Sequence, residues 1–491
     1  MPNYDLIIKN AHLVRHDREQ QALVDIGIVG GTIVAVERKL PASDSTHTID
    51  ADGLYAFPGA VDAHQHWGIY NPLDEDVSIE SRAAAQGGVT TGLTYMRTGR
   101  YYLNRSAPYS EFFPEVLALS AGRAHIDYGF HLAPMTKEHI SEIPFLIAEK
   151  GVSSFKIFMF YGSYGLHGRS DDQAAFLMTP TGERYDVAHF EFVMRGVQAA
   201  REARPDLAHG ISLSLHCETP EIMDAYTQLV MANRTLTGLA AYSASRPPHS
   251  EGLAVTIASY LAYETNLPSI NLLHLSSAKA MDAAMRMAAA FPEVDFRREV
   301  TIGHLLVDVE TADGLGGKVN PPIRSREDVE ALWEHLAAGN VSWVASDHAC
   351  CREEAKFGKP REDVFLAKSG FGGAEYLLPG MVSEAIRRGL GLHTVAALTS
   401  WNPARRFGLG SKGMIAEGYD ADVALVDIGT SWTVRAVDSL SSQEFTPFEG
   451  ISLQAKVLHA FLRGVKILDH GKVVGEPTGQ YVSRPSPAPS A

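Results

Sequence analysis

The stretch Phe57-Pro-Gly-Ala-Val-Asp-Ala-His64-Gln-His66-Trp-Gly decides how this sequence is interpreted, because an apolar run ends in two histidines one residue apart. Residues i and i+2 of a strand point to the same face, so His64 and His66 can direct both imidazoles at one point beyond the strand. Imidazole nitrogen binds divalent transition metals such as zinc. An isolated pair also fits surface or packed histidines, so the rest of the chain must decide.

Length and charge limit the class of protein. A chain of 491 residues fits an α/β barrel with a smaller attached domain. The net charge of −15 argues against nucleic acid or an anionic membrane as a partner. We find no signal-peptide pattern and no long apolar run, and Cys217, Cys350 and Cys351 are too few for a disulfide framework. The sequence predicts a cytoplasmic protein with reduced thiols.

Strand-like and helix-like segments alternate through the middle of the chain, which indicates a parallel sheet with helical crossovers. Amphipathic stretches such as 188–203 and 278–290 separate the strands. The apolar, β-rich runs are 57–63, 89–96, 126–132, 152–160, 211–215, 269–274, 298–304 and 341–346. Eight strands in this rhythm predict an α/β fold of the (β/α)8 TIM barrel type.

The two ends of the chain have a different texture, that of short strands separated by turns. We expect them to build one small β-sandwich domain around the inserted barrel. The Pro/Ser/Ala-rich end is expected to be flexible, or an arm on a neighbouring subunit. The predicted parts are 1–56 (β-sandwich, first part), 57–405 (barrel), 406–475 (β-sandwich, second part) and 476–491 (C-terminal tail).

The active site of such a barrel lies at the C-terminal ends of its strands. The side chains found there, or within the run in the case of the lysine, are His64, His66, Lys156, His216, His274 and Asp347. All are metal-binding types except Lys156, and a buried ammonium among histidines is costly. We hypothesise that CO2 carboxylates the Lys156 amine, giving an anionic carbamate, N6-carboxylysine, that can bridge two cations.

Six ordered motifs resemble the dihydropyrimidinase/hydantoinase branch of the amidohydrolase superfamily, which is also similar to allantoinase and dihydroorotase. The resemblance extends over nearly the whole chain. The motifs are Pro58-Gly-Ala-Val-Asp-Ala-His-Gln-His, Gly151-Val-Ser-Ser-Phe-Lys-Ile-Phe, Leu215-His-Cys-Glu, Leu273-His-Leu-Ser-Ser, Lys318-Val-Asn-Pro-Pro-Ile-Arg and Ala345-Ser-Asp-His-Ala. Together they are far more specific than any one of them.

The resemblance implies a hydrolase with two divalent metal ions per subunit, zinc in most of the family. His64, His66 and Asp347 would hold one ion, His216 and His274 the other, and carboxylated Lys156 would bridge them. Asp347 would also carry the proton from water to the leaving nitrogen. Tyr161 matches the family tyrosine that stabilises the oxyanion, and Asn320 matches the position that holds the ring amide of the substrate.

The expected substrate is a cyclic amide, namely a hydantoin, a dihydropyrimidine or a related imide. Trp67 and Tyr70 follow the two histidines where a dihydroorotase has an arginine, so we expect them to contact an apolar substituent. Arg97 is either a contact for an anionic group or a solvated loop residue. Phe371-Gly-Gly-Ala-Glu375 resembles the dihydroorotase and allantoinase version of the family.

Two other functions stay open at this point. One is a metal hydrolase of an acyclic amide, or a deaminase, and the other is a non-catalytic scaffold. Relatives of the second kind have lost metal ligands, whereas all six positions are present here. The resemblance also implies a homo-oligomer, a tetramer in the relatives.

Overall fold

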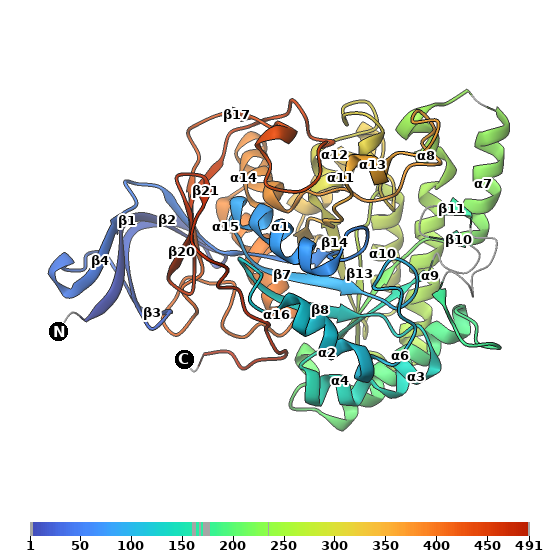
Figure 1. Cartoon of the computed structure of the whole chain (residues 1–491), viewed down its shortest axis with the longest axis horizontal. Coiled ribbons are helices and arrows are strands. Elements are labelled where there is room, and N and C mark those ends of the chain that lie inside the picture. The colour runs from blue at the N-terminus through green and yellow to red at the C-terminus, as the bar shows by residue number, and fades with distance from the viewer. Residues whose placement is uncertain (1–2, 160–163, 166–167, 170–176, 234, 490–491) are drawn as a thin grey trace.

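The computed structural model describes residues 3–159, 164–165, 168–169, 177–233 and 235–489. Its two main parts are a barrel ringed by helices and a sheet to which both ends of the chain contribute (Figure 1). The first strands of that sheet project from the barrel at the left of Figure 1.

Eight parallel strands form the barrel, in the same order in space as along the chain. They are β6 (Ala60–Gln65), β7 (Val89–Met96), β8 (Asp127–Leu132), β9 (Ser154–Phe158), β12 (Ser212–His216), β13 (Ser269–Leu272), β14 (Asp295–Thr301) and β15 (Trp343–Ala345). A parallel bridge between Gln65 and His348 joins the last strand's end to the first, so the sheet closes on itself. The predicted (β/α)8 barrel is confirmed.

The first predicted strand, 57–63, is wrong in one respect, because it belongs to two different sheets. Strand β5 (Tyr55–Pro58) pairs outside the barrel, and β6 starts at Ala60. Gly59 joins them, and its N–H donates to the carbonyl oxygen of Asp422 at 2.9 Å. A Cβ atom there would lie 2.2 Å from the Thr90 hydroxyl oxygen, so only glycine allows this close turn between the sheets.

Helices alternate with the strands and cover the outside of the barrel (Figure 1). They are α1 (Leu73–Gln86), α2 (Tyr109–Ser120), α3 (Lys137–Ser141), α4 (Ile143–Lys150), α6 (Val187–Ala203), α7 (Pro220–Asn233), α8 (Gly238–Ser245), α9 (Pro248–Glu264), α10 (Ala278–Ala290), α11 (Ile302–Leu306), α12 (Arg326–Ala337), α13 (Glu353–Lys356), α14 (Leu377–Arg388), α15 (Leu392–Ala396) and α16 (Asn402–Arg406). Helix α12 is typical. The Ser325 hydroxyl accepts the N–H of Asp328 at its start, and its apolar side chains form one buried stripe.

Nine strands from both ends of the chain pair in one sheet. The spatial order is β21-β20-β19-β16-β5-β1-β2-β3, with β4 beside β1. Their bounds are β1 (Tyr4–Arg15), β2 (Arg18–Val29), β3 (Thr32–Glu37), β4 (Ser45–Asp50), β16 (Val423–Asp427), β19 (Lys456–Leu462), β20 (Val465–Asp469) and β21 (Lys472–Val473). Two-stranded antiparallel sheets are formed by β10 (Tyr164–Gly165) with β11 (Gly168–Arg169) and by β17 (Trp432–Thr433) with β18 (Ser452–Leu453). The proposed domain boundaries stay predictions.

The tail, expected to be flexible, instead packs along the N-terminal ends of the barrel strands. The N–H groups of Gly479, Val482, Arg484 and Ser486 donate to carbonyl oxygens of the barrel or of the segment that follows it. The Arg484 side chain is buried, and its Nη1 donates to the Ser154 hydroxyl at 2.8 Å. These contacts close the barrel at the end opposite the predicted site.

Among the described residues no helix is long and apolar enough to cross a membrane. Cys217, Cys350 and Cys351 are buried and unpaired, in agreement with the expectation of reduced thiols.

Candidate active site

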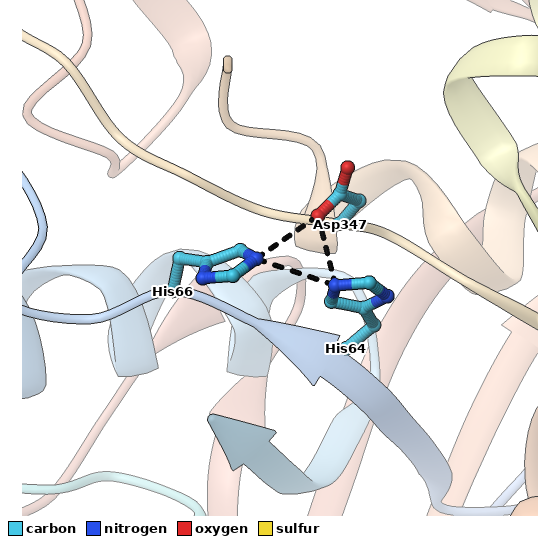
Figure 2. A group of neighbouring side chains, drawn as sticks. All are labelled: His64, His66 and Asp347. Carbon is cyan, nitrogen blue, oxygen red and sulfur yellow. Dashed lines mark hydrogen bonds and ion pairs between the residues drawn. The ribbon is translucent and has the colours of Figure 1, made fainter. Parts of the chain in front are cut away.

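His64, His66 and Asp347 converge at the C-terminal end of the barrel, pointing toward one another (Figure 2). The two Nε2 atoms are 3.2 Å apart. Asp347 Oδ1 lies 3.1 Å from His64 Nε2 and 3.3 Å from His66 Nε2. A tetrahedron with metal–ligand bonds of about 2.0 Å has edges of about 3.3 Å. The three atoms therefore have the spacing of ligands on a single small cation.

Protonation favours the same interpretation. Burial lowers the pKa of His64 and His66, so both imidazoles are neutral and can offer a lone pair. Burial opposes ionisation of Asp347, but the neighbouring His64 and the hydrogen bond from His66 hold the pKa of its carboxyl below the usual range. Neutral imidazoles around a carboxylate are the forms that bind a divalent metal.

Lys156 enters the same cluster from β9. Its Nζ lies 3.0 Å from His64 Nε2 and is enclosed by the rings of Tyr95 and Phe158, with centroids at 4.1 and 4.4 Å. Burial lowers the pKa of the Lys156 amine to about 7. A substantial share of the amines is thus uncharged at neutral pH, which is the form that reacts with CO2.

His216 and His274 lie on the other side of the lysine. Their ring centroids are 4.3 Å apart, and the His274 ring is 5.4 Å from that of His64. His274 Nδ1 is buried and has no hydrogen-bond partner among the described residues. A buried polar nitrogen without a partner is unfavourable unless something binds it. The donor set on this side also fits a metal.

Two glutamates that the sequence interpretation missed hold His64 and His216 in place. Glu299 of β14 places Oε1 2.7 Å from His64 Nδ1, and Glu218 places Oε2 2.7 Å from His216 Nε2. Arg246 donates to both oxygens of Glu218. Because Glu299 contacts Nδ1 of His64, Nε2 is the nitrogen of His64 that can face a metal. Because Glu218 contacts Nε2 of His216, Nδ1 is the nitrogen of His216 that can do so. Glu218 stood within a quoted motif, and Glu299 was a charged residue inside an apolar strand.

A cavity opens above this cluster. Its lining residues are His66, Ile69, Tyr102, Lys156, Phe158, His216, His274, Val319, Asn320, Asp347, Ala349, Ser369 and Gly370. Asn320 thus lines the cavity, and its side-chain oxygen accepts from the Tyr242 and Ser369 hydroxyls. Tyr102, which was not predicted, hydrogen-bonds His66 Nδ1 at 2.8 Å.

The remaining predicted residues are placed differently. Trp67 is fully buried in the apolar core beside Tyr128 and does not line the cavity. Tyr70 does not line the cavity itself, and its hydroxyl donates to the carbonyl oxygen of the lining residue Ser369 at 2.5 Å. Arg97 is buried, and its guanidinium lies over the Tyr102 ring. Tyr161 falls outside the described residues.

A model of the amidohydrolase family matches residues 182–467. The allantoinase of Rubrobacter xylanophilus is 33% identical over 490 residues, covering 98% of each chain. The D-hydantoinase of Rhizobium radiobacter is 29% identical over 494 residues, covering 98% of this chain and 99% of that protein. The dihydropyrimidinase structure from Brevibacillus agri matches with a TM-score of 0.82 at 25% identity, covering 99% of both chains.

Proposed function

The chain belongs to the amidohydrolase family of metal-dependent hydrolases, and from this premise we propose that it opens the ring of a cyclic amide. Cyclic ureides such as allantoin and hydantoins are the first candidates, since relatives named allantoinase and D-hydantoinase match along nearly the whole chain. One observation carries the proposal. The buried Lys156 amine, His66 Nε2 and Asp347 Oδ1 lie 3.0, 3.2 and 3.1 Å from His64 Nε2. These side chains come from three different strands or strand ends of the barrel, and His66 Nε2 is 3.3 Å from Asp347 Oδ1.

We assign the proposed ligands to two ions. His64, His66 and Asp347 would hold one, His216 and His274 would hold the other, and Lys156 as a carbamate would be shared by both. When bound, divalent ions supply Lewis acidity at the carbonyl and a nucleophile at neutral pH. Zinc suits this mixture of imidazole and carboxylate ligands.

The chain's own residues then handle the proton and the substrate. Asp347 accepts a proton from the attacking water at the carboxylate oxygen that does not face the two histidines, and delivers it to the ring nitrogen as the carbon–nitrogen bond breaks. Its depressed pKa keeps it ionised before the reaction. Asn320 holds the ring amide, and Tyr161 donates to the oxygen that becomes negative.

The wall of the cavity carries polar groups that suit a polar ring. Asn320, Tyr102 and Ser369 offer hydrogen-bonding groups on its wall, which suits the alternating N–H and C=O edge of a ureide. Trp67, which was expected to accept an apolar substituent, is packed in the core instead.

The test is ring opening by the purified protein with its metal counted. The panel should hold allantoin, hydantoin, phenylhydantoin, dihydrouracil, dihydroorotate and succinimide. Opening of any ring with two metals per chain supports the proposal. One metal per chain with deamination, or two metals with activity only on acyclic amides, would replace it. No metal and no activity would indicate a scaffold.

Assembly and location are part of the same proposal. We infer a homo-oligomer, a tetramer by likeness to the family. Exposed apolar side chains on α7 and α9, including Leu229 and Tyr260, support an interface there. The cytoplasmic location stays a prediction.

A further inference from the structure

We propose that Glu299 is a positioning residue for both halves of the metal centre: it fixes the tautomer of His64 and holds the backbone at His274. The proposal rests on the metal-dependent function above. It assigns a role to a residue that contacts neither the cavity nor the substrate.

Glu299 is fully buried and ties together three barrel strands or their ends. Oε1 lies 2.7 Å from His64 Nδ1 and accepts the backbone N–H of His274 at 3.1 Å. Oε2 accepts the indole N–H of Trp343 at 2.8 Å. The backbone carbonyl of Glu299 also accepts the N–H of Leu275 at 2.9 Å. One residue of β14 therefore links β6, the end of β13 and β15.

The contact with His64 selects one tautomer. A neutral imidazole carries a single N–H, and the other nitrogen keeps the lone pair. His64 Nε2 faces Lys156 Nζ at 3.0 Å and Asp347 Oδ1 at 3.1 Å, so this nitrogen must supply the lone pair to a metal. The proton then sits on Nδ1 and donates to Glu299, the arrangement that orients metal-binding histidines in general.

The contact with His274 supports an unusual backbone. His274 has a φ of 34°, in the left-handed region that non-glycine residues seldom adopt. Its own N–H and that of Leu275 both donate to Glu299, one to the side chain and one to the backbone. These two bonds hold the strand end in the conformation that turns the imidazole into the cluster.

A carboxylate, and not merely a polar side chain, is suited to this position. Burial raises the pKa of Glu299, but the N–H groups of Trp343 and His274 donate to its oxygens and favour the ionised form. His64 Nδ1 adds a third donor to the same two oxygens in the tautomer argued above. Glutamine has one acceptor oxygen, so its amide group would face a donor. If the glutamine oxygen served His64 and His274, its NH2 would meet the Trp343 indole N–H. Removing that indole donor would remove the conflict.

This conflict provides the experiment. In the Trp343→Phe background, residue 299 is kept as Glu or changed to Gln or Met, three side chains of similar length. Zinc affinity is measured by competition with a chelator. The melting temperature of the metal-free protein and kcat and KM on the opened substrate are measured beside it. Glu142→Gln is the control, because Glu142 also accepts two N–H groups, those of Tyr109 and Ser110.

We expect Trp343→Phe and Trp343→Phe/Glu299→Gln to bind zinc within about threefold of each other, because both keep an acceptor at Oε1. Trp343→Phe/Glu299→Met should bind at least about tenfold more weakly, the usual size of such supporting contacts. Glu299→Gln alone should also lose affinity, and the added Trp343→Phe change should restore it. Glu142→Gln should lower the melting temperature and leave zinc affinity unchanged.

The proposal would be overturned if neither the Gln nor the Met variant lost zinc affinity. It would also be overturned if both lost the same affinity, because the negative charge of Glu299, and not its role as hydrogen-bond acceptor, would then be what matters. If Glu299→Gln alone does not fold, the three variants in the Trp343→Phe background still decide. A wild-type protein that binds no zinc would instead refute the proposed function, so the two failures are distinguishable.

Discussion

The two ends of the barrel differ in the groups that they gather. At the C-terminal end, the histidines, Lys156 and Asp347 converge, His274 Nδ1 has no hydrogen-bond partner among the described residues, and His274 and Asp347 both adopt positive φ. At the N-terminal end, Lys412 Nζ lies between the carboxylates of Asp127 and Asp422, at 2.6 and 2.8 Å, and the tail adds a series of backbone hydrogen bonds. Strained backbone at potential metal ligands therefore lies where chemistry is proposed, and a buried ion cluster with the docked tail lies where only stability is needed.

The largest expected effect comes from removing the lysine at the C-terminal end. Lys156→Ala should lower kcat/KM by about 10³-fold or more, about 4 kcal/mol, because the ligand shared by both ions is lost. Metal analysis should give fewer than two ions per chain, with the far-ultraviolet circular dichroism spectrum unchanged. Full activity with two bound metals would contradict the assignment.

At the N-terminal end of the barrel, a truncation should lower stability and leave catalysis nearly unchanged. Deleting residues 479–491 removes at least four backbone hydrogen bonds and the buried Arg484. At about 1 kcal/mol for each bond, the free energy of unfolding should fall by about 3 kcal/mol or more. Denaturant titration measures this loss.

Activity per folded molecule should stay within about twofold of the full chain. Gly410→Ala is a milder version of the deletion, since a Cβ atom there would lie 1.9 Å from the Pro487 carbonyl oxygen. A deletion that preserves stability but abolishes catalysis would reverse the comparison between the two ends.

The pH dependence of reactivation tests the lysine further. Carbamate forms from the neutral amine, and burial lowers the pKa of Lys156 to about 7. At a fixed concentration of dissolved CO2, the rate at which metal-free protein regains activity should rise about tenfold between pH 6 and pH 8 and then level off. An amine with the ordinary pKa of a lysine would continue to accelerate up to about pH 10. Recovery of activity after adding zinc at each pH distinguishes the two.

The smallest effect is expected at the cavity wall. Tyr102→Phe removes the hydroxyl that lies 2.8 Å from His66 Nδ1 and leaves the ring in place. One neutral hydrogen bond contributes about 1 kcal/mol, so kcat/KM should fall about fivefold. Steady-state kinetics on the preferred ring would show it, and a loss as large as that of Lys156→Ala would mean that the hydroxyl takes part in the chemistry.

The sequence predicted the barrel and its strand ends because both follow short-range rules. The period of two placed His64 and His66 on one face, and the barrel rule placed His216 and His274 at one end. This period does not extend to Trp67, because β6 ends at Gln65 and Trp67 lies in the turn that follows. Its side chain is buried in the core, so being next to a ligand in sequence did not bring it into the cavity.

Contacts between distant segments could not be predicted in this way. Glu299 contacts His64 across 235 positions of sequence, and nothing local indicates which partner a buried glutamate will find. The tail has the composition of a flexible segment, yet its backbone finds acceptors on the barrel that only the folded chain presents. The turn at Gly59 likewise depends on Thr90, which lies in the neighbouring strand.

The sheet shared by both ends of the chain also governs how the protein can be made. Pro58 pairs with Val423, so a ribosome must synthesise the whole barrel before β5 meets its neighbour β16. Until then β5 presents an unpaired edge, which is a template for association with other nascent chains. Prematurely terminated products are therefore expected to aggregate readily and to bind chaperones. Synthesis of the last strands is expected to be the step that covers this edge and ends the risk.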